Sequence, residues 1–156
     1  LVRQHRVEER VRATRLRQSV AEASRDCRAF AMARAFERAG DYTEAAEHFA
    51  LAASFQERRR FNGNLGLTSN PRGNGHRTGK HRIDCMRDGT LCLYVLHQEA
   101  DLAYQIRFPG GRKSSIQADE LVALDGPGMY ILLVEDERPA TYTVEVEIYN
   151  GSLDGR

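Results

Sequence analysis

The stretch Thr141-Tyr142-Thr143-Val144-Glu145-Val146-Glu147-Ile148-Tyr149 carries the clearest structural signal in the chain. Apolar and polar side chains alternate along it, which is typical of a β-strand with one buried face. Working back from this stretch, we expect further short strands at Ile83–Arg87, Thr90–His97, Asp101–Phe108, Ser115–Gln117, Leu121–Leu124 and Met129–Glu135. Short strands at such regular spacing indicate an antiparallel β-sandwich or barrel over residues 83–156.

Turn residues separate these strands. Pro109-Gly110-Gly111 and Asp125-Gly126-Pro127-Gly128 fit between strands, and Asp88-Gly89 is typical of a two-residue hairpin. Such a hairpin would place Cys85 directly across from Cys92.

Residues 1–60 have a different pattern and predict a helical hairpin. Val2 to Ala39 contains no Gly or Pro, which favours one long helix or two helices with a bend. Gly40 suits the residue that ends a helix, and Asp41 can cap a second helix with Glu44 three residues later. The second helix is expected to reach Arg60. Apolar residues expected along one side of the first helical stretch are Val7, Val11, Leu16, Val20, Cys27, Phe30, Ala31 and Ala35.

Residues 61–82 are rich in Gly and Asn and carry four basic residues without an acidic one, which predicts a basic loop. The fold class that follows is α+β, with an amino-terminal helical hairpin followed by an antiparallel β-sandwich. The net charge is +8 over residues 1–82 and −7 over residues 83–156. This charge separation allows the two parts to attract each other.

The stretch Ala39-Gly40-Asp41-Tyr42-Thr43-Glu44-Ala45-Ala46-Glu47-His48-Phe49-Ala50-Leu51-Ala52 resembles the middle of a tetratricopeptide repeat. It is equally similar to the helical hairpin of microtubule-interacting-and-trafficking domains. The closing Pro expected near Glu57 is absent, and the chain holds no second copy. A single repeat cannot bury its apolar face alone, so the resemblance implies contact with another surface, in particular with a protein.

The segments Asp101–Tyr104, Gly128–Val134 and Ala140–Val146 together resemble bacterial pre-peptidase carboxyl-terminal domains. They are also similar to the β-sandwich that follows the protease core in calpains. Both kinds of module are non-catalytic attachments, so the resemblance implies that this part of the chain is not an enzyme.

Two sets of residues could in principle bind a ligand, one a zinc ion and the other a phosphate group. His81, Cys85, Cys92 and His97 are residue types that bind zinc, but no Cys-x-x-Cys pair is present. Buried free thiols are favoured for Cys85 and Cys92, with a cross-strand disulfide as the alternative. Residues 73–81 resemble a phosphate-binding loop, but Asn74 and His81 stand where that loop needs Gly and Ser or Thr. We therefore expect no catalytic residue, metal or cofactor.

Arginine dominates the first helical stretch and indicates a surface that attracts anionic groups. A solvated helical face explains the same pattern, because Glu8, Glu9 and Glu22 interleave with the arginines. Among partners, an acidic protein surface is favoured, and the lack of aromatic residues there disfavours single-stranded nucleic acid. The residues predicted to bind a partner are Arg3, Arg6, Arg10, Phe36, Tyr42, Phe49, Arg77 and Lys80, with the aromatic ones either touching the partner or packing beneath the contact.

The resulting hypothesis is a non-catalytic scaffold or adaptor subunit that mediates protein–protein contacts in a larger assembly. Alternatives are a regulatory or attachment segment of a larger enzyme such as a calpain-like protease, and a ribonucleoprotein subunit. The longest apolar runs, Leu91–Leu96 and Met129–Val134, are too short to span a bilayer as a helix. Because the first residues are unlike a secretory signal, a cytoplasmic location is expected. The resemblance to microtubule-interacting hairpins implies a cytoskeletal location as a further expectation.

Overall fold

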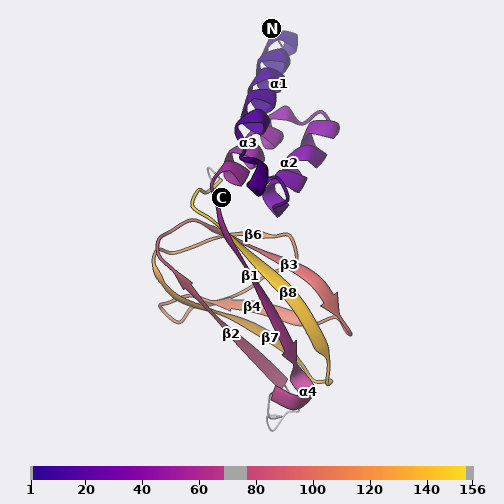
Figure 1. Ribbon diagram of the computed structural model, residues 1–156, viewed down its shortest axis with the longest axis vertical. Helices are drawn as coiled ribbons and strands as arrows, with labels where there is room; N and C mark the ends of the chain where they lie inside the picture. Colours follow the sequence, from indigo (N-terminus) through magenta and orange to yellow (C-terminus); the bar gives the residue numbers. More distant parts are fainter. Residues whose placement is uncertain (1, 69–76, 154–156) are drawn as a thin grey trace. The chain divides into compact units, whose positions relative to one another are not determined.

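The computed structural model describes residues 2–68 and 77–153 of the chain (Figure 1). Helices occupy the amino-terminal third, and eight strands follow. The helices are α1 (Val2–Ser19), the 3-10 helix η1 (Glu22–Ser24), α2 (Arg28–Arg38), α3 (Tyr42–Ala53) and α4 (Leu65–Thr68). The strands are β1 (Phe55–Asn64), β2 (Arg77–Cys85), β3 (Thr90–Gln98), β4 (Ala103–Arg107), β5 (Lys113–Ser115), β6 (Leu121–Ala123), β7 (Gly128–Asp136) and β8 (Thr141–Tyr149).

The chain divides into two compact units. The first, here called the helical unit, comprises the residues up to Glu57 and those from Ile148 onward. The second, here called the sandwich unit, comprises Arg58–Glu147.

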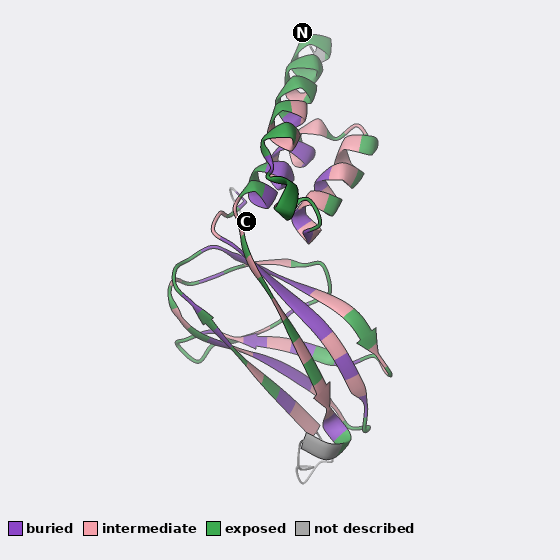
Figure 2. Cartoon of the chain, viewed as in Figure 1, coloured by how far each residue is buried: buried purple, intermediate pink, exposed green. Residues whose placement is uncertain are grey.

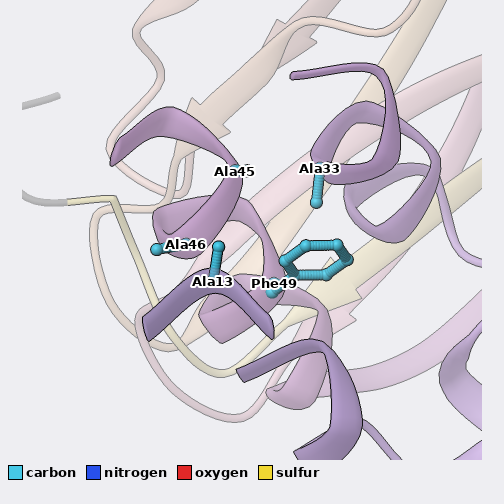
Figure 3. Close-up of a cluster of buried hydrophobic side chains, with 5 residues drawn as sticks. All are labelled: Ala13, Ala33, Ala45, Ala46 and Phe49. Atoms are coloured by element: carbon cyan, nitrogen blue, oxygen red, sulfur yellow. The ribbon is translucent and has the colours of Figure 1, made fainter. Parts of the chain in front are cut away.

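Small side chains let the three main helices of the helical unit pack closely. Phe49 of α3 is fully buried and forms one core cluster with four fully buried alanines (Figure 3). Phe30 of α2 contacts the same ring edge-on, with centroids 5.3 Å apart. The small side chains at this helix packing are those of Ala13, Ala33, Ala45 and Ala46.

The turn between α2 and α3 forms as the sequence predicts. Gly40 has a φ of +82°, a conformation that favours glycine after a helix. The backbone N–H of Glu44 donates a hydrogen bond of 3.3 Å to the side chain of Asp41, which caps α3. The predicted helix stop and cap are therefore confirmed.

The predicted helix over Val2–Ala39 is interrupted between Ser19 and Arg28. The Ser19 hydroxyl donates to the carbonyl of Leu16, and this local bond competes with continued helix formation. Arg25 Nε donates a 3.1 Å hydrogen bond to the carbonyl of Val20 within the segment that joins α1 and α2. Of the two predicted possibilities, the structure therefore excludes one long helix and agrees with two helices, α1 and α2, joined through η1.

The predicted second helix up to Arg60 is wrong beyond Ala53. Residues 55–64 form strand β1, in which partly buried and exposed residues alternate. The outward side chains of β1 face those of β8 in antiparallel order. Arg58 Nη2 lies 2.8 Å from Glu147, Arg60 Nη2 lies 2.8 Å from Glu145, and the Thr143 hydroxyl donates to Asn62. These cross-strand pairs, far apart in sequence, favour a strand over the helical propensity of the segment.

Two four-stranded antiparallel sheets form the sandwich, in the orders β1-β8-β3-β6 and β2-β7-β4-β5. The fold class is therefore α+β, with helices followed by an antiparallel β-sandwich, as the sequence predicts. Tyr130 is fully buried and fixes the Asp125–Gly128 turn, because its hydroxyl donates to Gly126 and accepts from the N–H of Asp125.

Asp88-Gly89 does not form the predicted hairpin. β2 pairs with β7, whereas β3 pairs with β6, so the dipeptide connects strands of different sheets. Cys85 lies opposite Gly128 and Cys92 opposite Leu121. Both thiols are buried and neither forms a disulfide. The predicted placement of Cys85 opposite Cys92 is wrong, because local turn residues do not determine which sheet each strand joins.

The predicted loop over residues 61–82 is wrong at both of its ends. Phe61–Asn64 complete β1, Leu65–Thr68 form α4, and Arg77–Arg82 begin β2, while residues 69–76 lie outside the described residues. Tertiary contacts order these Gly-containing segments. Tyr142 lies so close to Gly63 and Gly79 that a Cβ atom at either position would overlap its ring or hydroxyl. Its hydroxyl is 2.6 Å from His81 Nε2, and Phe61 stacks on the His81 ring.

Candidate functional site

The exposed side of α1 carries positive charge that the described residues do not neutralise. α1 contains six arginines, and Arg17 forms a hydrogen-bonded ion pair with Glu37, at 2.7 and 2.8 Å. The other five are exposed and form no ion pair with any described residue. We call them the α1 arginines: Arg3, Arg6, Arg10, Arg12 and Arg15. Much of α1 is coloured as exposed in Figure 2.

Tyr42 fixes the position of two α1 arginines. The guanidinium carbons of Arg6 and Arg10 lie 5.9 and 5.8 Å from the centre of its ring. Arg6 and Arg10 are one helical turn apart and therefore reach the same ring. A cation–π contact contributes about 0.5–1 kcal/mol at an exposed site and leaves the positive charge available to a ligand.

A shallow pocket of about 280 Å³ lies beside this ring. The Thr43 hydroxyl donates a 3.1 Å hydrogen bond to Glu9 on one wall. On another wall, the guanidinium of Arg6 approaches Gly40 so closely that a Cβ there would lie 2.9 Å from Nη2. The lining residues are His5, Arg6, Glu9, Gly40, Asp41, Tyr42 and Thr43.

A second hollow, about 300 Å³ in volume, lies along α1 itself and contains no acidic residue. Val11 is part of its lining and is 51% exposed, and Val7, one turn before it, is 54% exposed. The residues that line the hollow are Arg10, Val11, Thr14, Arg15 and Gln18. An apolar strip therefore runs between arginines on this face.

The exposure of these valines corrects the prediction that Val7, Val11, Leu16 and Val20 share one helical side. A helix advances about 100° per residue, so the five residues from Val11 to Leu16 rotate the side chain by about 140°. Leu16 packs against the helical core, and Val11 consequently points away from it. The five-residue spacing between Val11 and Leu16 already indicated that they lie on different sides of the helix, and the sequence prediction missed it.

The structure brings only some of the predicted partner-binding residues together. Arg6, Arg10 and Tyr42 form one cluster, and Arg3 is exposed one turn before Val7. Phe49 is completely buried in the helical core, so it packs beneath the surface and cannot touch a partner.

The other residues predicted to bind a partner lie outside the cluster of Arg6, Arg10 and Tyr42. Phe36 packs partly buried against the helical core and lies 4.9 Å from the His48 ring. Arg77 and Lys80 belong to β2 of the sandwich unit, where Arg77 donates a 3.4 Å hydrogen bond to the carbonyl of Leu65 and Lys80 is exposed.

The described part of the chain contains no candidate metal site. No three His, Cys, Asp or Glu side chains there are grouped so that they could hold an ion. In residues 2–68 and 77–153, no helix is both long enough and apolar enough to cross a membrane.

The sequence matches no known protein family, and no curated protein is significantly similar to it. Among solved structures, the chain is similar to the serine protease of Aeromonas sobria, with 12% identity and a TM-score of 0.36 over 69% of this chain. It spans 30% of that protease. It is also similar to PirA, with 11% identity and a TM-score of 0.28 over 58% of this chain and 93% of PirA. Similarity this low carries no conclusion about activity.

Proposed function

We propose that the protein is a non-catalytic adaptor or scaffold subunit whose helical unit binds an acidic surface of a protein partner. The observation that carries this proposal is the set of five exposed α1 arginines without a carboxylate partner among the described residues. Like charges on one helix repel one another, and an acidic partner would relieve that repulsion. Opposite charge also accelerates the encounter of two proteins and orients them.

Two further features support a protein partner. The stretch Ala39–Ala52 resembles tetratricopeptide and microtubule-interacting hairpins, which make protein–protein contacts. Val7 and Val11 are exposed between the arginines, and a phosphate backbone would leave such apolar side chains unused. The resemblance of the β-strands to pre-peptidase and calpain sandwiches supports a non-catalytic role in the same assembly.

The proposal can be tested with a fluorescein-labelled polyglutamate peptide and an RNA duplex of similar charge, titrated from about 50 to 300 mM salt. We expect the peptide to bind at low salt, and Arg6→Gln with Arg10→Gln and Arg15→Gln to weaken it about ten-fold or more. The matched control is Arg87→Gln with Arg107→Gln and Lys113→Gln, which removes three positive charges from the sandwich unit. If the peptide does not bind, or if the control weakens it equally, the proposal is wrong. Tighter, steeply salt-dependent RNA binding would instead support the ribonucleoprotein alternative.

A further inference from the structure

The most informative unexplained feature of the helical unit is the pair of exposed valines on α1. Val7 and Val11 are 54% and 51% exposed although Ala13 of the same helix is fully buried. They are spaced by one helical turn and therefore form a continuous apolar strip about 6 Å long. We call this strip the valine strip.

Charged and polar residues surround the valine strip in a regular way. Arg3 lies one turn before Val7, and Arg15 lies one turn after Val11, on the same helical side. Arg10, Val11 and Arg15 all line the hollow of about 300 Å³ on this side of α1. The surface therefore offers an apolar centre with positive charge at both ends and no carboxylate in the hollow.

We propose that the valine strip is the docking site for an acidic amphipathic helix of the partner protein. Apolar side chains of that helix, spaced by three or four residues, pack on Val7 and Val11. Its flanking carboxylates pair with Arg3, Arg10 and Arg15. This inference rests on the proposed function and adds the kind of partner element that the surface recognises.

The spacing and chemistry of the valine strip favour a helix over other occupants. Helix-in-groove recognition uses apolar anchors one turn apart, which is the spacing that the strip offers. Helices that lie on membranes bury larger residues such as Trp, Phe and Leu, whereas this strip offers two valines. Charge complementarity selects an acidic helix, because the α1 arginines beside the strip have no ion-pair partner among the described residues.

The test uses two labelled synthetic peptides of identical composition, rich in Glu and Leu. In one, the leucines recur every three or four residues and form one helical face; in the other, the order is scrambled. Because the protein contains no Trp, binding is followed by anisotropy of a fluorescein on the peptide. We expect the chain of residues 1–156 to bind the amphipathic peptide about ten-fold or more tightly than the scrambled one.

The decisive variant is Val7→Gln with Val11→Gln, which keeps the charge and does not lower helix propensity while removing the apolar strip. We expect it to bind both peptides with the weaker affinity of the scrambled one. The matched control is Leu96→Gln, since Leu96 is a 40% exposed apolar residue of the sandwich unit. It should bind the peptides like the parent protein, and circular dichroism should show unchanged helix content in all variants.

Several outcomes would overturn the inference. Equal binding of both peptides, unaffected by the valine substitutions, would leave an acidic partner in place but exclude recognition of an amphipathic helix. Self-association that the valine substitutions abolish would assign the strip to a second copy of this chain. Tighter binding to vesicles containing phosphatidylserine would assign it to a membrane. If no acidic peptide binds, the proposed function fails as well.

Discussion

The arginines of α1 and those of β1 show how one residue type has different consequences in two regions of the molecule. On β1, Arg58 lies 3.0 Å from Glu145 and 2.8 Å from Glu147, and the side chain of Glu147 is only 2% exposed. On α1, Arg6 and Arg10 contact the Tyr42 ring and have no carboxylate partner among the described residues. Composition alone would treat these arginines as equivalent.

This difference separates charge that stabilises the fold from charge that is available for binding. Burying a carboxylate costs free energy unless its charge is paired, so the ion pairs of Arg58 contribute to the stability of the sheet. An exposed arginine on a helix contributes little to stability and can be retained for another purpose. Substitutions in the two regions should therefore differ strongly in their effect on the free energy of unfolding.

Arg58→Ala should have the largest effect, because it removes one ion-pair partner from each of two carboxylates, one of them almost fully buried. We expect the free energy of unfolding to fall by about 3 kcal/mol. Urea denaturation followed by circular dichroism measures this change. Arg10→Ala is the control and should have far less effect; equal losses for the two variants would remove the distinction between the two regions.

Gly63→Ala should be the next most damaging change. The new Cβ would overlap the ring of Tyr142, which cannot move away freely because Gly79 lies close to its hydroxyl and His81 bonds to it. Overpacking of this kind lowers the free energy of unfolding by about 1–3 kcal/mol. Gly110→Ala is the matched control, since no atom lies within 4 Å of its Cβ position. Thermal unfolding curves for the two variants that coincide would contradict the close packing around Tyr142.

His81 should add a smaller effect that depends on pH. Burial lowers the pKa of His81 below its ordinary value of 6.5. The unfolded chain therefore binds the proton more readily, and the contribution of His81 to stability is present above pH 6.5 and lost as the pH falls through the folded pKa. Burial also raises the pKa of Tyr142 to about 12, so its hydroxyl stays protonated over this range.

The measurement is the free energy of unfolding at a series of pH values between neutral and mildly acidic. We expect His81→Gln to flatten the fall in stability, while the control His97→Gln retains it. An unchanged slope in His81→Gln would show that another group causes the acid sensitivity.

Arg6→Gln with Arg10→Gln should have the smallest effect on stability. Only the contacts with the Tyr42 ring are lost, and the free energy of unfolding should change by less than about 1 kcal/mol. Binding of the polyglutamate peptide should nevertheless weaken. A stability loss as large as that of Arg58→Ala would mean that these arginines serve the fold and would weaken the proposed function.

Local signals in the sequence predicted much of the fold. Gly40 and Asp41 determine the turn and the cap between α2 and α3 through their own backbone and side-chain chemistry. The alternation over Thr141–Tyr149 matches β8, and the predicted strands after residue 89 match β3 to β8 within a few residues. Such signals are readable because they depend on residues that are neighbours in the chain.

Prediction of the candidate site was partial. Arg6, Arg10 and Tyr42 were expected at a binding surface and form one cluster, whereas Phe49 is buried and Val7 and Val11 are exposed. The helical period could have separated Val11 from Leu16. The burial of Phe49 depends on which helices pack around α3, and the sequence does not specify that packing locally.

Local sequence patterns specified the helices before residue 54, the strands from Thr90 onward, the turn at Gly40 and the concentration of positive charge in α1, because propensity, capping and charge are properties of short segments. Only the tertiary structure decided that residues 55–64 are a strand and that Asp88-Gly89 joins two different sheets. It also decided which arginines are paired. Strand partners and ion pairs such as Arg58 with Glu147 join residues far apart in the chain, so their energies appear only when the fold brings them together.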